Sequence, residues 1–174
     1  MRDENLEVLL TRSQISDRVA ELAEAISRDY EQKNLLMLCV LKGAIIFLSD
    51  LIRNLQVPAE IDFVAASSYE KTKSRGDVSL SPILSTDVRG KDTLVVEDIV
   101  DTGLTYHSLS EYLLPRRPAS LRLCTLLDKP SRRRAIQIRA DYVGFTIPDK
   151  FAVGYGMDYE GKYRGLRDIC ILRT

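Results

Sequence analysis

The chain has 174 residues, which is enough for one domain that buries about 70% of the surface of the unfolded chain. Its 25 Lys and Arg balance 25 Asp and Glu, so no overall field favours nucleic acid or an acidic membrane as a partner. Three cysteines lie in apolar runs, and buried free thiols are expected at Cys39, Cys124 and Cys170. The acidic N-terminus and the lack of a long apolar run predict a cytoplasmic protein with no membrane segment.

The first third of the sequence predicts helices that alternate with strands. Apolar residues spaced by three and four between Ile15 and Tyr30 indicate a helix that Ser13 could cap. The unbroken apolar run 35–41 is typical of a parallel strand buried on both faces. A helix over 44–55 and a strand over 61–66 follow. The inward-facing residues of this second helix are predicted to be Ile45, Leu48, Leu51, Ile52 and Leu55.

The rest of the chain continues the pattern after a polar segment, 67–79, that is predicted to be a mobile loop. Strands are expected over 93–96, 121–127 and 142–145, a helix over 105–114, and short strands over 151–155 and 169–172. This alternation predicts an α/β fold, a doubly wound, mostly parallel sheet flanked by helices. Residues 1–174 should form one domain, in which about 148–174 and the N-terminal residues make a small C-terminal hood.

The segment from Thr93 to Thr105, TLVVEDIVDTGLT, is the most informative in the chain. An apolar strand runs into Glu97 and Asp98, and Asp101-Thr102-Gly103 then begins a helix. The free N–H groups and the dipole of a helix N-terminus favour a phosphate, whereas carboxylates suit sugar hydroxyls or the water shell of magnesium. An ordinary capped βα loop is the plainer alternative, but capping alone does not require such a cluster of acids. The segment therefore predicts a site for a phosphorylated sugar.

This segment resembles the signature with which type I phosphoribosyltransferases bind 5-phosphoribosyl 1-pyrophosphate (PRPP). Further segments make the whole chain similar to the hypoxanthine-guanine phosphoribosyltransferases. These segments are Leu41-Lys42-Gly43, Ser68-Tyr69, Lys129 after Leu126-Leu127, Ile147-Pro148-Asp149-Lys150-Phe151 and Val153-Gly154-Tyr155. The resemblance implies the type I phosphoribosyltransferase fold and purine salvage, in which magnesium-dependent transfer from PRPP to hypoxanthine or guanine gives IMP or GMP plus pyrophosphate.

The resemblance also implies how PRPP would bind. Residues Asp101, Thr102, Gly103, Leu104 and Thr105 would hold the 5-phosphate, although many relatives have Lys where this chain has Leu104. The pyrophosphate would meet Leu41, Lys42, Gly43, Ser68, Tyr69 and Arg164, and the ribose hydroxyls would meet Glu97 and Asp98. The Mg²⁺ ligands would be Glu97, Asp98 and Asp158. The family often has a cis peptide before the residue that is Lys42 here, which the sequence alone does not reveal.

The purine would bind beside these groups. By resemblance, Asp101 is the general base that takes the purine proton. Lys129 would donate to the 6-oxo group, Phe151 would stack on the ring, and Ile99, Ala152 and Asp158 would complete the pocket. The sequence leaves open whether xanthine is a substrate.

Two alternatives concern other kinds of partner. A PRPP-sensing regulator with the same fold would bind nucleic acid, but it would not need Asp101, Lys129 and Phe151 together. The basic run 131–134 has no interleaved aromatic residues, so a solvated face or an oligomer contact is favoured over RNA binding. The predicted partners are PRPP, a 6-oxopurine and copies of the same chain, in a homodimer or homotetramer.

Overall fold

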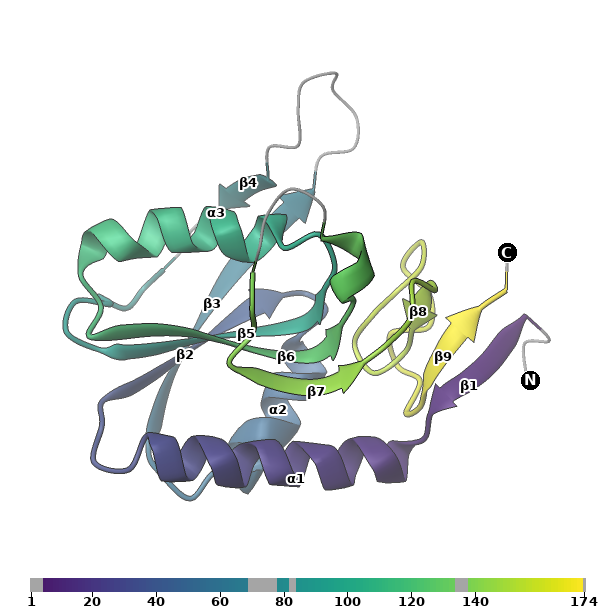
Figure 1. Cartoon of the computed structure of the whole chain (residues 1–174), viewed down its shortest axis with the longest axis horizontal. Helices are drawn as coiled ribbons and strands as arrows, with labels where there is room; N and C mark the ends of the chain where they lie inside the picture. The colour runs from purple at the N-terminus through teal and green to yellow at the C-terminus, as the bar shows by residue number, and fades with distance from the viewer. Residues whose placement is uncertain (1–4, 69–77, 82–83, 134–137, 174) are drawn as a thin grey trace.

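The computed structural model describes residues 5–68, 78–81, 84–133 and 138–173. These residues form a six-stranded sheet, a three-stranded sheet and the helices beside them (Figure 1). The elements are β1 (Leu6–Leu10), α1 (Arg12–Asp29), β2 (Leu35–Leu41), α2 (Ile45–Asn54), β3 (Ala59–Ser68), β4 (Val78–Ser81), β5 (Asp92–Val100), α3 (Leu104–Leu113), η1 (Leu114–Arg116), β6 (Ser120–Asp128), η2 (Pro130–Arg132), β7 (Tyr142–Thr146), β8 (Ala152–Val153) and β9 (Ile169–Leu172). No helix in these ranges is long and apolar enough to cross a membrane.

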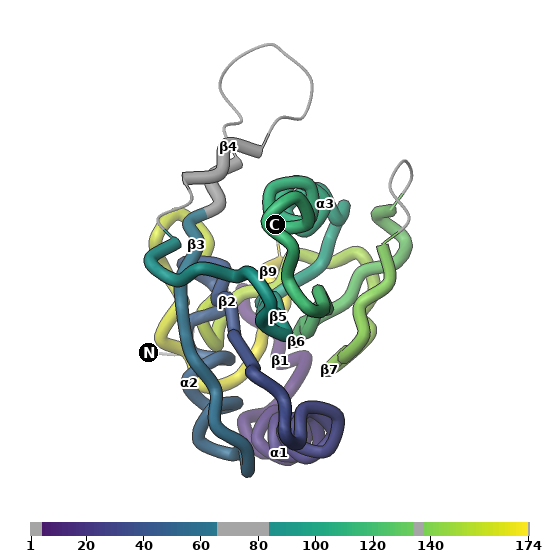
Figure 2. Tube along the Cα trace, turned by 90° about the vertical axis from the view of Figure 1, so that its left-hand side faces the viewer, coloured from purple at the N-terminus to yellow at the C-terminus, as the bar shows by residue number. Residues whose placement is uncertain are grey.

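The large sheet has the strand order β4-β3-β2-β5-β6-β7, in which all neighbours are parallel except β3 and β4. Helices α1 and α2 lie on one face and α3 lies on the other, as Figures 1 and 2 show. The predicted doubly wound fold is confirmed. Strand β4 was not predicted. It forms because its backbone pairs with the end of β3, for example Ser67 with Ser79, within the segment that was predicted as a loop. Residues 69–77 of that loop lie outside the described residues.

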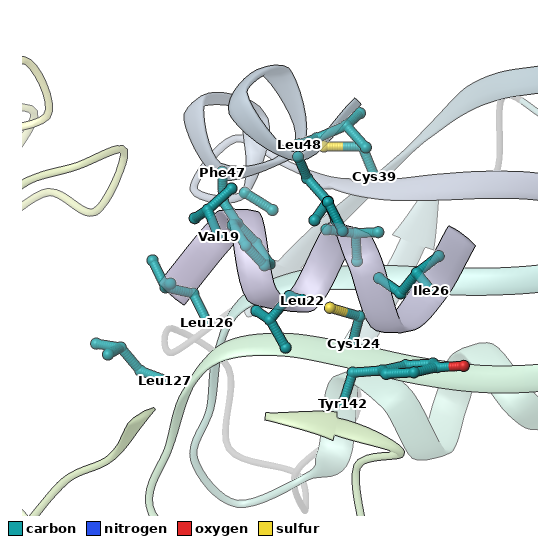
Figure 3. Packing of buried hydrophobic residues seen from close by; sticks show 14 of the residues in the cluster. Val19, Leu22, Ile26, Cys39, Phe47, Leu48, Cys124, Leu126, Leu127 and Tyr142 are labelled. Carbon is teal, nitrogen blue, oxygen red and sulfur yellow. The ribbon is translucent and has the colours of Figure 1, made fainter. Parts of the chain in front are cut away.

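Alternate residues of β2 enter two separate cores, as expected for a strand covered on both faces. Leu35, Met37 and Cys39 pack with α1 and α2, whereas Leu36, Leu38 and Val40 pack on the side of α3. Figure 3 shows the first core, where side chains of α1 and α2 meet those of β2, β6 and β7. The three cysteines are buried free thiols, as predicted.

Two details of the helices differ from the sequence-based expectation. The cap of α1 is Thr11 and not Ser13, because the side chain of Thr11 accepts from Gln14 N while that of Gln14 accepts from Thr11 N. In α2, Ile45 is 44% exposed, whereas Phe47, Leu48 and Leu51 are buried. Within the first turn of α2, Ile45 therefore faces away from the core.

The strand order reverses between β2 and β5. From β2 the chain passes through α2 to β3 on one side, and from β5 it passes through α3 to β6 on the other side. Their carboxyl ends lie next to each other, since Cys39 is paired with Val96. Ligands of open α/β sheets bind at such a reversal, and here it places the turn at Lys42 beside the segment after Glu97.

The small sheet has the order β1-β9-β8 and lies beyond the end of β7 (Figure 1). It corresponds to the predicted hood and includes N-terminal residues, because Leu6 is paired with Leu172. Strand β9 has its predicted bounds, but β8 is shorter than the predicted 151–155. Gly154 and Tyr155 have positive φ angles, which end the extended conformation.

The buried carboxylate of Asp62 joins β3 to the segment before β5. Asp62 Oδ1 accepts from Phe63 N at 2.8 Å and from Ser85 Oγ at 3.3 Å, and Oδ2 accepts from Thr86 N at 2.8 Å. Burial raises the pKa of this carboxyl, but the hydrogen bonds from Phe63, Thr86 and Ser85 outweigh burial and lower it below its usual value.

We therefore expect Asp62→Asn to lower the free energy of unfolding by about 1–3 kcal/mol at pH 7. Because the pKa of Asp62 is lower in the folded state than in the unfolded state, its carboxylate stabilises the fold above the unfolded-state pKa. This stabilisation is lost as the pH falls through the folded-state pKa. The difference between wild type and Asp62→Asn in urea denaturation should therefore shrink in acid. The exposed Asp87, which accepts from Arg89 N at 3.0 Å, provides the control Asp87→Asn. Equal effects of the two variants, or a difference that does not depend on pH, would contradict this assignment.

Candidate active site

A cavity of about 790 Å³ opens where the carboxyl ends of β2, β5 and β6 face the hood. It is lined by Leu41, Lys42, Gly43, Ala65, Asp98, Ile99, Asp101, Lys129, Arg132, Asp149, Lys150, Phe151, Ala152, Met157, Asp158 and Arg164. Eleven of the residues predicted from the sequence are in this set. Segments from both halves of the chain thus meet in one cavity at the reversal of strand order.

A second cavity of about 390 Å³ adjoins the first. The two cavities share Leu41, Gly43, Asp98, Ile99, Asp101 and Asp158 as lining residues. The smaller cavity is also lined by Val40, Glu97, Thr102, Gly103 and Thr105. Asp101 therefore lies where the two cavities meet. The smaller cavity is lined by the β5–α3 loop, and the larger one by Lys129.

Residues that line both cavities lie in close contact with one another. The Leu41–Lys42 peptide is cis, and Gly43 follows it. A Cβ atom on Gly43 would lie 1.7 Å from Asp98 Oδ2, and a Cβ on Gly156 would lie 2.1 Å from the carbonyl oxygen of Gly43. An added Cβ at residue 43 would displace the carboxylate of Asp98, whereas at residue 156 only glycine fits, because the clash is with a backbone carbonyl and φ is +102°. The hood, the β2 turn and β5 are thereby in direct contact.

The two carboxylates at the end of β5 point to opposite faces of the sheet, because neighbours on a strand alternate. Burial and the charge of Asp98 raise the pKa of Glu97 to about 8, although Arg133 opposes the shift. Burial likewise raises the pKa of Asp98 to about 6, although hydrogen bonds from the backbone N–H groups of Ile99 and Asp98 and the charge of Arg164 oppose the shift. Glu97 is 3% exposed, and its Oε1 has no hydrogen-bond partner within the described residues. Both carboxylates thus lack sufficient positive charge nearby.

The loop from Asp101 to Thr105 presents the N-terminus of α3. The helix begins at Leu104, and the preceding Gly103 has a φ of +84°. Thr102 Oγ1 accepts from Leu104 N at 3.4 Å. The first N–H groups of α3 and the residues Thr102, Gly103 and Thr105 therefore surround the smaller cavity, whereas Leu104 lines neither cavity.

The far end of the larger cavity combines a buried cation with an exposed ring. Lys129 is 6% exposed. Its backbone N–H donates to Val100 O at 2.9 Å, and this hydrogen bond fixes the turn after β6. Phe151 is 49% exposed and packs edge to face on Tyr159, with ring centroids 5.5 Å apart. A planar, polar molecule could contact both the ammonium and the ring.

The hood adds an ion pair to the cavity. Arg164 Nη2 lies 2.5 Å from Asp158 Oδ1, and Arg164 Nη1 donates to Gly156 O. Gly156 N donates in turn to Arg164 O at 3.0 Å. Arg164 is thus held against the same glycine that contacts the β2 turn.

The interpretation of the basic run 131–134 as a solvated face or an oligomer contact was wrong for Arg133, which is largely buried. Arg132 is exposed, but the sequence did not reveal its contacts in the cavity. Arg132 lines the larger cavity, and its Nε donates to Asp101 Oδ1 at 2.8 Å. Arg133 is ion-paired with Asp128 and donates to Ile138 O at 2.8 Å. The sequence Lys-Pro-Ser-Arg could have indicated this, since a tight turn after Pro130 brings Arg132 to the side of Lys129.

Sequence reasoning also missed Ala65, Asp149, Lys150, Met157 and Val40 as lining residues. Of the predicted site residues, Tyr69 lies outside the described residues, and only the backbone of Ser68 is described, at the end of β3. Within the described ranges there is no group of three or more His, Cys, Asp or Glu side chains that could hold a metal. The carboxylates predicted as metal ligands, Glu97, Asp98 and Asp158, therefore do not form a closed cage.

Comparison with known proteins identifies the family of this site. Residues 6–160 match the model of the phosphoribosyl transferase domain. The chain is 49% identical to a hypoxanthine-guanine phosphoribosyltransferase of Mycobacterium tuberculosis, over 91% of this chain and 82% of that protein. It is 43% identical to a hypoxanthine-guanine-xanthine phosphoribosyltransferase of Tritrichomonas foetus, over 99% of this chain and 94% of that protein.

A solved structure is similar throughout. It is the hypoxanthine phosphoribosyltransferase of Trypanosoma cruzi in complex with the product IMP, with a TM-score of 0.90 and 41% identity over 99% of this chain and 97% of that one. Fold and sequence therefore agree, and the chain belongs to the phosphoribosyltransferase family.

Proposed function

We propose that this protein transfers the 5-phosphoribosyl group of PRPP to hypoxanthine or guanine and releases pyrophosphate, a reaction of purine salvage. One observation carries the proposal: a helix N-terminus suited to a phosphate adjoins, through Asp101, a cavity with a buried Lys129 and an exposed Phe151. A phosphate site and a purine site are thus within reach of one PRPP molecule and one base. The relatives with these activities support the same assignment.

PRPP would occupy the region where the two cavities meet. The N–H groups at the start of α3, with Thr102 and Thr105, would bind the 5-phosphate, since that end of the helix carries partial positive charge. The backbone of Lys42 and Gly43 and the guanidinium of Arg164 would bind pyrophosphate. Asp98 would face the ribose hydroxyls, with Glu97 behind it.

The chemistry of the carboxylates fits a magnesium ion. Asp98 and Asp158 line both cavities, and burial raises the pKa of Asp98 to about 6, so a cation would relieve the shortage of positive charge. Mg²⁺ usually takes one or two protein carboxylates and completes its shell with water and phosphate oxygens, so a closed protein cage is not required. We propose that Asp98 and Asp158 hold it, while Glu97 contributes its charge from the opposite face of β5. The ion would stabilise the negative charge of departing pyrophosphate.

The purine would lie between Phe151 and Ile99 in the larger cavity, with Ala152 and Asp158 at its second position. The ammonium of Lys129 would donate to the 6-oxo group. A 6-amino group offers hydrogens instead and would leave this buried ammonium without an acceptor, so adenine should be rejected. Asp101 would accept the proton that the purine nitrogen loses as it bonds to the ribose.

The alternative, a PRPP-sensing regulator that binds nucleic acid, receives no support from the relatives. A sensor of PRPP has no need of a purine pocket with Lys129 and Phe151. Of the arginines that might have bound RNA, Arg132 contacts Asp101 and Arg133 contacts Asp128.

Assembly and location are part of the proposal. Ile61 and Phe63 lie on one face of β3 and are 37% and 41% exposed. This apolar surface favours contact between copies of the chain, in a homodimer or homotetramer. We propose a cytoplasmic enzyme whose residues 1–174 act as one domain, because the hood and the large sheet share the cavity.

Assays of hypoxanthine, guanine, adenine and orotate with PRPP and magnesium test the function. We expect hypoxanthine and guanine to be used with kcat/KM at least about 1,000-fold above adenine and orotate, because only a 6-oxo group in a purine meets Lys129. An assay of xanthine in the same series shows whether the enzyme also accepts this base. Preferential use of adenine or orotate would contradict the proposal.

The contact between Gly43 and Asp98 generates a second prediction. Gly43→Ala places a Cβ where Asp98 Oδ2 lies, so it should lower kcat/KM for PRPP by about 100-fold or more. Gly165→Ala is the matched control, because no atom lies within 4 Å of its added Cβ, and we expect it to stay within about twofold of wild type. Circular dichroism checks that both variants fold. Wild-type kinetics of a folded Gly43→Ala variant would refute the role of this contact.

A further inference from the structure

Arg132 lies between two carboxylates that belong to different loops of the cavity. Its Nε donates to Asp101 Oδ1 at 2.8 Å, and its Nη1 lies 3.6 Å from Asp149 Oδ2. Asp101 follows β5, whereas Asp149 lies two residues before Phe151. All three charged side chains line the larger cavity. One guanidinium therefore connects the loop of the proposed general base to the loop of the proposed stacking ring.

The chain places Arg132 there by means of the short helix η2. Lys129 is tied to the end of β5 through Val100 O, and Arg132 N donates to Lys129 O at 3.1 Å. In a 3₁₀ turn, residues three apart lie above each other on the same side. The turn that directs Lys129 into the cavity thus directs Arg132 to the same cavity.

The surroundings of this ion pair indicate that it has a role other than stabilising the fold. The side chains of Arg132, Asp101 and Asp149 are 47%, 36% and 52% exposed, so solvent screens their attraction. The adjacent Arg133 and its partner Asp128 are only 10% and 12% exposed. Arg133 therefore belongs to the interior, whereas Arg132 can be changed with little loss of stability.

We propose that Arg132 is a positioning residue for phosphoribosyl transfer, which orients the carboxylate of Asp101 and links it to the loop of Phe151. This inference rests on the proposed function. The bond from Arg132 Nε engages Oδ1 and leaves Oδ2 to accept the purine proton. As the bond between the purine nitrogen and ribose C1 forms and the bond from C1 to pyrophosphate breaks, that N–H proton passes to Asp101. A carboxylate free to rotate would meet the proton less often in the right geometry.

Steady-state kinetics of Arg132→Gln, Arg132→Lys, Asp101→Asn and the double variant Arg132→Gln/Asp101→Asn test the proposal with hypoxanthine and PRPP. We expect Arg132→Gln to lower kcat by about 10- to 100-fold while KM for PRPP changes by less than about threefold. Arg132→Lys should recover part of kcat, because lysine keeps the charge but lacks the planar guanidinium. In the Asp101→Asn background, Arg132→Gln should cause less than about a twofold further loss, since it acts through that carboxylate.

The matched control is Arg173→Gln, which removes an exposed arginine that donates to Glu7 at 3.1 Å outside the cavity. It should keep wild-type kinetics, and all variants should keep the melting temperature of wild type within a few degrees. Equal fold losses from Arg132→Gln in both backgrounds, or an unchanged kcat in Arg132→Gln, would overturn the positioning role. Absence of turnover by the wild type would instead refute the proposed function itself, so the two failures are distinguishable.

Discussion

The candidate site depends on a contact in which two glycines allow three segments of the chain to approach one another closely. Gly156 of the hood lies against the carbonyl of Gly43, and Gly43 lies against the carboxylate of Asp98. A methyl group at either glycine would occupy space that a carbonyl or carboxylate oxygen fills. This contact sets the distance between the hood and the large sheet, and thereby brings Asp158 and Arg164 to the end of β5.

The alternation of side chains along β5 then places neighbouring carboxylates on opposite faces of the sheet. Asp98 points toward the β2 turn and the hood, whereas Glu97 points toward Arg133 and Tyr106 on the side of α3. Beyond Val100 the strand becomes the loop at the start of α3, so in the proposed assignment one continuous segment would serve ribose, phosphate and purine. The second wall of the cavity is formed by Lys129 and Arg132, which follow β6, and by the loop of Phe151, which follows β7. We propose that this wall binds the base. The proposed binding sites of the two substrates would thus lie side by side at the carboxyl ends of β5, β6 and β7.

The sequence predicted those parts of the structure in which local pattern and burial agree. The apolar run 35–41 is a strand of those bounds, and the predicted site residues between Asp98 and Thr105 line the cavities, except Leu104. The prediction failed where a distant partner decides the outcome. Strand β4 forms because its backbone pairs with β3, the first turn of α2 leaves Ile45 outside the core, and Arg132 finds a carboxylate 31 residues away. Such partners leave no periodic signal along the chain.

A crystal structure of the enzyme with its product nucleotide IMP tests the central claim most directly, because one molecule reports on both cavities. We expect the 5′-phosphate at the N-terminus of α3 beside Thr102 and Thr105, the purine against Phe151, and the 6-oxo group within hydrogen-bond distance of Lys129 Nζ. A nucleotide bound with its phosphate away from α3, or with its base outside the cavity of Lys129, would contradict the account.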